Sequence, residues 1–317
     1  MNSPITVTNP PGWFLRWFDN YADDSGTNAG NPDRIDWARC VPFIAMHVAC
    51  LGVFWTGWSA TALAVAGGLY LIRMFAITGF YHRYFSHRSF KTSRFFQGTM
   101  AFIGCTSVQR DPIWWASHHA HHHAHSDNPD DPHSPRQKGF WKSHVGWFLT
   151  VEGFQTRWQY VKDWQCFPEL RFFNRFDIGP PTLLALSLFS GGAALERWAP
   201  GLATNGWQLL TWGFVVSTVA LYHGTFTVNS IAHGFGSRRY ATKDDSRNNL
   251  WIALLTLGEG WHNNHHHYPG ASRQGFFWWE IDLTYYGLVA LEKVGLIWDL
   301  REVPKAVRDR NLVEATR

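Results

Sequence analysis

The chain has 317 residues, a net charge of +4 and only 16% charged residues. A charge this small and scattered argues against nucleic-acid binding. The four cysteines form no Cys-x-x-Cys pair, so we expect free thiols and neither an iron–sulfur cluster nor a disulfide framework. The 19 tryptophans are the first unusual feature. Tryptophan gathers where membrane meets water, because its ring is apolar and its N–H needs a partner.

In chain order, a polar segment comes first and four apolar stretches follow. Residues 1–39 lack the short apolar core of a cleaved signal peptide. The apolar stretches each approach the ~20 residues that cross the hydrocarbon core of a bilayer. We therefore predict one all-α membrane domain over residues 1–317, with two transmembrane hairpins. The four predicted transmembrane helices are residues 41–58, 59–80, 181–198 and 207–228, which leaves segments 81–180 and 229–317 outside the membrane.

The distribution of lysine and arginine predicts the orientation. The connectors of the two hairpins carry only two charges, Glu196 and Arg197. The positive-inside rule then puts both termini and the two long segments in the cytoplasm. Arg73, inside the second apolar stretch, is interpreted as an interfacial residue in preference to a charge near a functional cavity.

The 17 histidines are the second unusual feature, and most lie beside the predicted membrane exits. His82 and His87 are five residues apart and do not share a helix face well, but they could converge if a helix ends at His82 and the chain then turns. His262, His265 and His266 follow an i, i+3, i+4 spacing, which puts three imidazoles on one helical face. This is how a helix presents several ligands to a metal ion.

The middle histidine box, residues 118–125, fits two helical registers. Both His118/His121/His122 and His119/His122/His123 satisfy the i, i+3, i+4 spacing. The spacing alone does not choose between them.

Asn229 and His233 form a further i, i+4 pair at the end of the fourth apolar stretch. A chance histidine run could explain one box, but not several boxes that all lie at membrane exits. Isolated histidines such as His47 and His223 are better explained as hydrogen-bonded helix residues. Zinc is the alternative metal, but it usually takes four ligands, often with cysteine. Imidazole suits iron, copper, zinc and nickel alike.

These motifs resemble the membrane-bound fatty acyl desaturases, in particular the Δ9 acyl-CoA branch. The resemblance runs from about residue 42 to residue 301. It covers H-R-x-x-S-H at 82–87, Trp-Ala before the middle box, D-P-H at 131–133, S-H-V-G-W at 143–147, N-S-x-A-H at 229–233 and G-E-G-W-H-N-x-H-H at 258–266. The Trp-Ala pair selects the His119 register. The ligands that the resemblance implies are His82, His87, His119, His122, His123, His233, His262, His265 and His266, with Asn229 acting through a water.

The resemblance implies a helical cytoplasmic cap that holds two iron ions. It also implies O2-dependent desaturation of a saturated long-chain acyl thioester, with a cis double bond at carbon nine. No dinucleotide, haem or cysteine motif is present to supply electrons. The expected partners are therefore the bilayer, a long-chain acyl-CoA or other acyl carrier, and a separate donor: ferredoxin, rubredoxin or cytochrome b5 with an NAD(P)H reductase.

Three other functions stay open. An acyl-lipid desaturase or a hydroxylase would use the same histidine boxes. A metal transporter or store is less consistent with the pattern, because transporters place polar ligands near the bilayer midplane.

The sequence departs from the family pattern beside the middle box. Ala120 stands where the family usually has arginine, and Ser117-His118 replaces an Arg-Asp pair that lies near the carrier head group in the animal acyl-CoA enzymes. We expect cations to meet an anionic carrier, Lys138 and Lys142 above all, although a positive-inside excess would look the same. The candidate cations are Arg83, Arg88, Lys91, Arg94, Arg136, Lys138 and Lys142.

The second apolar stretch is the expected ruler for chain length, because it leads to His82. Counting back at 3.6 residues per turn puts Thr78, Phe75 and Leu71 on the His82 face, with Gly67 and Gly68 deeper. The chain end is expected between Phe75 and Gly67, a stretch in which Tyr70 is bulky but off that face. Alternatively, the glycines allow the first two transmembrane helices to pack closely.

Overall fold

The computed structural model describes residues 14–23, 31 and 33–313, so the two termini and part of the predicted N-terminal segment lie outside the described residues. The described chain is mainly helical. The longer helices are α1 Trp37–Ala49, α3 Ala60–Phe75, α4 Arg94–Cys105, α5 Pro112–His125, α8 Pro168–Arg175, α9 Gly179–Trp198, α11 Ser217–Ser230 and α14 Leu283–Lys293. The shorter α-helices are α2 Val53–Thr56, α6 Pro135–Lys138, α7 Phe140–His144, α10 Gly206–Gln208, α12 Leu250–Leu255, α13 His262–His267 and α15 Lys305–Arg308.

Two π-helical stretches and several 3₁₀ turns complete the described helices. The π stretches are η4 Ala76–Ser86 and η9 Leu209–Val216. The 3₁₀ turns are η1 Leu15–Trp17, η2 Asn20–Asp23, η3 Cys50–Gly52, η5 Gly146–Leu149, η6 Trp158–Tyr160, η7 Lys162–Cys166 and η8 Pro200–Leu202. The strands β1 Lys91–Thr92 and β2 Ile297–Trp298 pair antiparallel and tie the segment after η4 to the C-terminal region.

Three continuous helices in the described residues are long and apolar enough to cross a membrane: Trp37–Thr56, Ala60–Ser86 and Gly206–Ser230. The predicted third transmembrane helix falls in α9, which qualifies only together with α8 across a bend of 75°. The bend has a local cause, since Pro180 and Pro181 occupy the first turn of α9. Proline is tolerated there but cannot continue a helix that precedes it. The structure thus gives three candidate transmembrane helices, or four if the bent pair counts as one.

The second candidate transmembrane helix extends past the predicted end at residue 80. The expectation that a helix ends at His82 is wrong, because η4 continues to Ser86 in π geometry. The backbone N–H of His87 donates to the carbonyl of His82 at 3.2 Å, an i to i+5 hydrogen bond. This wider turn brings the two imidazole rings to 4.9 Å between centroids, so five-residue spacing is compatible with convergence.

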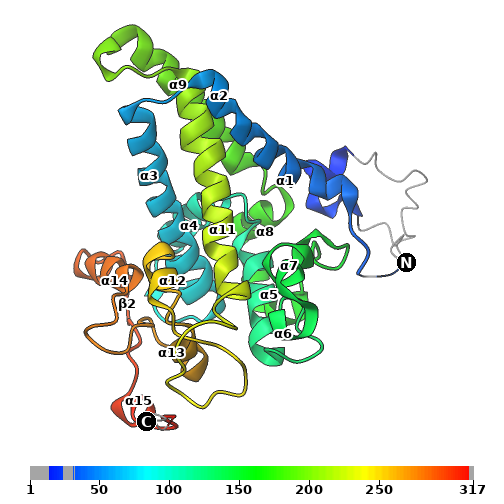
Figure 1. Cartoon of the computed structure of the whole chain (residues 1–317), viewed down its shortest axis with the longest axis vertical. Helices are drawn as coiled ribbons and strands as arrows, with labels where there is room; N and C mark the ends of the chain where they lie inside the picture. Colours follow the sequence, from blue (N-terminus) through cyan, green and yellow to red (C-terminus); the bar gives the residue numbers. More distant parts are fainter. Residues whose placement is uncertain (1–13, 24–30, 32, 314–317) are drawn as a thin grey trace.

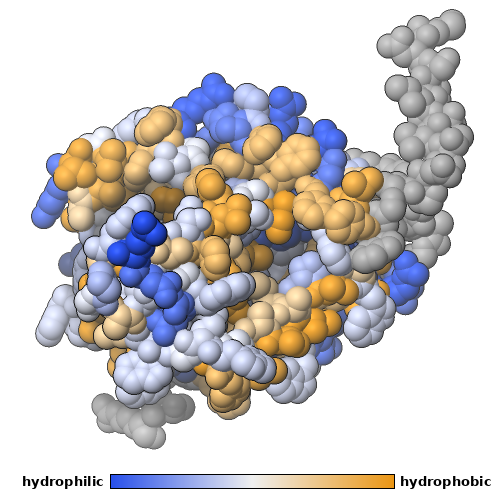
Figure 2. Space-filling model, turned by 90° about the horizontal axis from the view of Figure 1, so that it is seen from above, coloured by the Kyte–Doolittle hydropathy of each residue, from blue (hydrophilic) through white to orange (hydrophobic). Residues whose placement is uncertain are grey.

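The helix connectors and the histidine-bearing elements lie at opposite ends of the molecule. In Figure 1, α2 and the end of α9 are at the top, whereas α5, α13 and the lower end of α11 lie below. Seen from the connector end, hydrophobic side chains make up much of the surface (Figure 2). An aromatic-rich core, with Phe80, Tyr81 and Phe85 at its centre, packs η4 against α4 and α5.

Arg73 is not an interfacial residue, contrary to the prediction. Its side chain is 1% exposed. The guanidinium donates to the hydroxyls of Ser217 and Thr218 and to the carbonyl of Thr106. These acceptors come from helix α11 and from the end of α4, and they satisfy a charge that would otherwise be costly inside a membrane helix. Arg73 therefore joins the second and last candidate transmembrane helices.

Candidate metal centre

Nine histidines meet in two adjacent clusters, in which five of them are buried and four are half-buried. The potential ligand atoms of each cluster all lie within 4.8 Å of one another. The five-histidine cluster consists of His82, His87, His119, His123 and His265. The four-histidine cluster consists of His122, His233, His262 and His266. These are the nine histidines that the resemblance singled out.

Two helices supply both clusters. Helix α5 gives His119 and His123 to the five-histidine cluster and His122 to the four-histidine cluster. Helix α13 gives His265 to the first cluster and His262 and His266 to the second. The three histidines of α13 were expected to share one helical face and one site. Instead, α5 and α13 each direct adjacent histidines towards different clusters.

The ring nitrogens approach one another as metal ligands would. The Nε2 atoms of His87 and His119 are 2.8 Å apart, and those of His123 and His265 are 2.9 Å apart. Nε2 of His266 is buried and has no hydrogen-bond partner among the described residues. Neutral imidazole nitrogens that converge in this way fit a first-row transition metal ion in each cluster.

Three aspartates hold the rings of the four-histidine cluster by their other nitrogen. Nδ1 of His122 lies 2.9 Å from Asp131, and Nδ1 of His266 lies 2.7 Å from Asp244. Nδ1 of His233 lies 2.8 Å from Asp127. A carboxylate at Nδ1 fixes the tautomer that leaves Nε2 unprotonated, and it makes that nitrogen a better donor to a metal.

The five-histidine cluster has one such carboxylate, Glu259, which contacts Nδ1 of His82. Glu259 is shared with the buried Arg83, whose guanidinium lies 3.1 Å away and also pairs with Asp282 at 3.0 Å. Gln274 donates to the second oxygen of Glu259 at 3.0 Å. Arg83 therefore offsets part of the negative charge near His82, since its one positive charge is shared by two carboxylates.

Burial favours the neutral form, which binds metals, in six of these imidazoles. Burial, and then the neighbouring imidazoles, hold the pKa of five of them well below the ordinary value; these are His87, His119, His123, His262 and His265. Burial also lowers the pKa of His266, to about 4, although Asp244 opposes the shift. Burial alone would raise the pKa of Asp131, but His122 and His133 hold it far below its usual range.

The other histidines of the boxes lie outside both clusters. His118 bonds the carbonyl of Gln155 at 2.9 Å, and His121 lies between Tyr160 and the carbonyl of Asp130. His125 bonds the carbonyl of His121, and His267 stacks on Tyr240 at 3.9 Å. Isolated His47 and His223 bond each other at 3.2 Å, as expected for helix histidines with partners.

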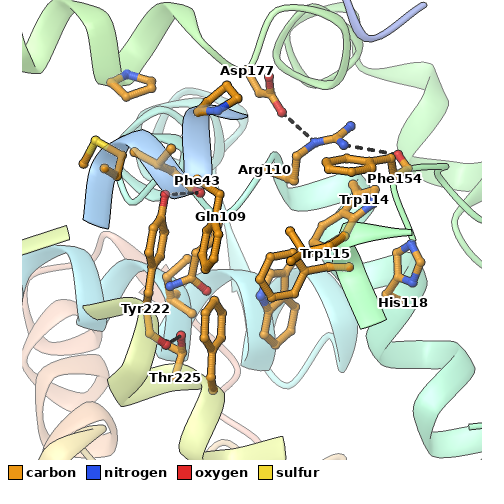
Figure 3. A pocket seen from close by; sticks show the side chains of 18 of the residues that line it. Phe43, Gln109, Arg110, Trp114, Trp115, His118, Phe154, Asp177, Tyr222 and Thr225 are labelled. Carbon is orange, nitrogen blue, oxygen red and sulfur yellow. Dashed lines mark hydrogen bonds and ion pairs between the residues drawn. The ribbon is translucent and has the colours of Figure 1, made fainter. Parts of the chain in front are cut away.

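A cavity of about 600 Å³ leads to the clusters. Histidines of both clusters line it, as do Asn229 and Glu259. Figure 3 shows Phe43 and Tyr222 on one side of the cavity, with Arg110 and Trp114 facing them. Its size lies within the range of about 300–1,000 Å³ that is usual for small-molecule sites.

None of the expected chain-length residues lines this cavity. Leu71 is 52% exposed, and the hydroxyl of Tyr70 donates to the carbonyl of Leu255 at 2.7 Å. Phe75 packs against Gly287 of α14. A Cβ at Gly67 would meet nothing within 4 Å, so this glycine also serves no close helix packing. Thr78, which was expected on the His82 face but not as the chain-length stop, lines the cavity together with Ile77.

Lys138 and Lys142 do not line this cavity either. Lys142 pairs with Asp33 at 3.4 Å, and Lys138 is the last residue of α6.

The carboxylates behind the histidines were not predicted: Asp127 and Asp244 were assigned no role, and Asp131 and Glu259 were noted only as parts of motifs. The sequence did offer a signal for these carboxylates, because each of the four lies within a few residues of a histidine box or in a segment rich in polar residues. Glu259, for example, precedes His262 by three residues.

Comparison with known proteins agrees with the site. A family model described as fatty acid desaturase matches residues 56–286. An acyl-CoA 5-desaturase of Anemone leveillei is 37% identical over 272 residues, which cover 84% of this chain and 79% of that protein. An sn-1 stearoyl-lipid 9-desaturase of Anabaena variabilis is 35% identical over 86% of this chain and 96% of that protein. A palmitoyl-monogalactosyldiacylglycerol delta-7 desaturase of Arabidopsis thaliana is 34% identical over 87% and 71%.

Proposed function

Because the chain belongs to the fatty acid desaturase family, we propose that it introduces a cis double bond near carbon nine of a saturated long-chain fatty acyl group. The observation that carries the proposal is the convergence of nine histidines in two clusters, four of which (His82, His119, His122 and His262) line one largely apolar cavity. A saturated chain has no polar group near its reacting carbons, so an enclosing apolar wall must position them.

The two clusters would each hold one iron ion, with Asn229 acting beside the four-histidine cluster. Bound iron would supply O2 activation and redox chemistry, which the protein itself lacks. In the overall reaction, two C–H bonds on adjacent carbons are lost and one C=C bond forms. O2 is reduced to two water molecules, with two electrons and two protons taken from outside the acyl chain.

The residues of the chain position the substrate and exclude water. Trp114, Trp115 and Phe148 are cavity-lining aromatic residues near the middle histidine box. Gln109 and Thr225 are neutral hydrogen-bonding groups in the same wall. The two electrons come from an external ferredoxin, rubredoxin or cytochrome b5 with an NAD(P)H reductase.

We place the protein in a membrane with four transmembrane helices, a helical cytoplasmic cap and both termini in the cytoplasm. The scarcity of charge in the hairpin connectors supports this orientation. A reporter fused after Arg317 should therefore score as cytoplasmic, and an external score would overturn the orientation.

Expression of the chain in a desaturase-deficient host, followed by mass spectrometry of its lipids, tests the function. We expect a new cis monounsaturated acyl chain. A hydroxylated product would instead support a hydroxylase on the same scaffold. If the host makes no new unsaturated acyl chain although the protein holds iron and the electron donor works, the proposal is contradicted.

Histidine variants test the ligand assignment in the same assay. We expect His119→Ala and His123→Ala to remove product formation and lower the iron content. His121→Ala and His125→Ala, on the same helix but outside the clusters, should keep much of both. The reverse pattern would overturn the register.

Metal analysis of the active protein should find about two iron ions per chain. Heterologous overexpression can load zinc instead, because zinc outranks ferrous iron in intrinsic affinity. Activity that does not depend on iron would contradict the assignment.

A further inference from the structure

Helix α12, which lies outside the candidate transmembrane helices, leaves one apolar face uncovered. The helix reads Leu-Trp-Ile-Ala-Leu-Leu and carries no polar side chain. Ile252 is buried, whereas Trp251 is 78% exposed. At 3.6 residues per turn, the exposed side chains share one side of the helix; they are Leu250, Trp251, Leu254 and Leu255. A helix at a water surface normally has a polar face there, and α12 has none.

A second exposed apolar surface lies before and along the first turn of α14. Trp278 is 81% exposed, and α14 contains no charged residue before Glu292. The two surfaces are connected, because the backbone N–H of Thr284 donates to the carbonyl of Leu257 at 2.8 Å, just after α12. We call them together the α12–α14 patch, which consists of Leu250, Trp251, Leu254, Leu255, Trp278, Trp279, Ile281, Leu283 and Tyr286.

The α12–α14 patch adjoins the second candidate transmembrane helix. The hydroxyl of Tyr70 donates to the carbonyl of Leu255 at 2.7 Å, and the hydroxyls of Thr78 and Thr284 lie 2.7 Å apart. Tyr70 and Thr78 both belong to the long apolar helix Ala60–Ser86. Figure 1 shows α12 and α14 beside the lower end of α3. The patch therefore lies next to a segment at membrane depth.

The patch also continues a surface that faces lipid. Leu71 and Ile72 follow Tyr70 directly and are exposed on α3. Uncovered apolar side chains of a transmembrane helix contact lipid tails, which are as apolar as leucine. The patch extends this surface, and its three tryptophans are the residues that gather at the membrane–water boundary. An apolar surface of this extent is rarely left in contact with water.

The ends of α12 and α14 are suited to a place with little water, where backbone groups need partners in the protein. The side chain of Asn249 accepts from the backbone N–H groups of Trp251 and Ile252. Asp282 does the same for Tyr285 at the start of α14. At the other end of α12, Tyr70 donates to a carbonyl that the helix itself leaves free.

We propose that the α12–α14 patch is inserted in the cytoplasmic leaflet of the bilayer, at the boundary between head groups and acyl chains. The segment 229–317 is then anchored in the membrane and is not wholly in the cytoplasm. The anchor lies on both sides of the last histidine box, since α12 precedes His262 and Trp278 follows His266. The inference rests on the membrane placement proposed above and does not depend on the reaction.

Nitroxide labels on single introduced cysteines test the anchor in the full-length protein in phosphatidylcholine bilayers. Cys166→Ser removes the exposed native thiol, and this chain without an added cysteine gives the background signal. Collisions with O2, which concentrates among acyl chains, are compared with collisions with a polar nickel chelate. The ratio of O2 to nickel collisions at Trp251→Cys and Trp278→Cys should be at least about fivefold higher than at Leu312→Cys, because hydrocarbon excludes polar solutes.

Two control positions make the result decisive. Leu312 is also exposed, but it lies beside Tyr240 near the C-terminal end of the described chain, away from α3. Leu71→Cys on α3 reports the membrane placement itself, and nickel access there would overturn that placement. With Leu71→Cys protected, nickel access at Trp251→Cys and Trp278→Cys would overturn the anchor. Poor access of both reagents, as a second copy of the chain would produce, would overturn the assignment to lipid.

A measurement on the unsubstituted chain covers the case in which a variant does not fold, which circular dichroism detects. Phosphatidylcholine with a diazirine on its acyl chain is activated by light, and mass spectrometry maps the lipid adducts on peptides. We expect adducts in α3, in residues 250–255 and in residues 278–286, and none in residues 305–313. Adducts in α3 without any in residues 250–255 and 278–286 would overturn the anchor.

Discussion

The two histidine clusters differ in what stands behind their ligands. In the four-histidine cluster, three of four rings contact an aspartate through Nδ1. In the five-histidine cluster, only His82 contacts a carboxylate, and that carboxylate also pairs with Arg83. For His87, His119 and His123, the described residues offer Nδ1 no carboxylate partner.

The difference shows that ligand number and charge compensation are divided between the clusters. Five imidazoles surround one position, and the one carboxylate found behind them among the described residues, Glu259, also pairs with Arg83. Four imidazoles and three carboxylates surround the other, and the carboxylate charge stabilises a cation and favours its more oxidised state. We therefore expect the four-histidine cluster to bind its metal more tightly, despite having fewer protein ligands.

Asp131→Asn should reduce the expected difference in metal affinity between the two clusters more than the other substitutions below. Asp131 supports His122 at 2.9 Å and also holds His133 at 2.6 Å. The amide keeps the size of the side chain and removes its charge. We expect one of the two metal equivalents to bind about 100-fold more weakly, the upper end of the range for such outer partners. Metal titration followed by elemental analysis measures this, and an equal loss at both positions would contradict the comparison.

Asp244→Asn should have a smaller effect on the same cluster, about tenfold in metal affinity, because Asp244 supports His266 alone. Asp245→Asn is the matched control, since its side chain pairs with the exposed Arg136 and touches no clustered histidine. If both substitutions weaken metal binding equally, the carboxylate of Asp244 does not act through His266.

Glu259→Gln should have the smallest effect on metal binding, no more than a few-fold, because Arg83 offsets part of the charge of Glu259. The main expected change is a loss of stability of the order of 1–3 kcal/mol, since Arg83 loses one buried partner but keeps Asp282. Thermal unfolding and metal titration separate the two effects. A loss of metal affinity as large as that of Asp131→Asn would remove the distinction between the clusters.

Much of this site could be predicted from local sequence. The resemblance selected His119, His122 and His123, and these lie in the clusters while His118 and His121 lie outside. Helical spacing alone had left the two registers equal. The chain-length residues were not predictable, because they were counted along one helix from His82, whereas the cavity is bounded by α1, α9 and α11.

The sequence by itself determined the apolar stretches, because hydropathy is a local property, and the resemblance of its motifs selected the nine histidines. Only the tertiary structure decided how α5 and α13 divide their histidines between two clusters. Neighbouring side chains on a helix diverge, so the cluster each one joins depends on what packs opposite it. The aspartates behind His122, His233 and His266 also depend on packing, since Asp127 reaches a histidine 106 residues away. Charge placement of this kind comes from chain segments that meet only in the folded protein.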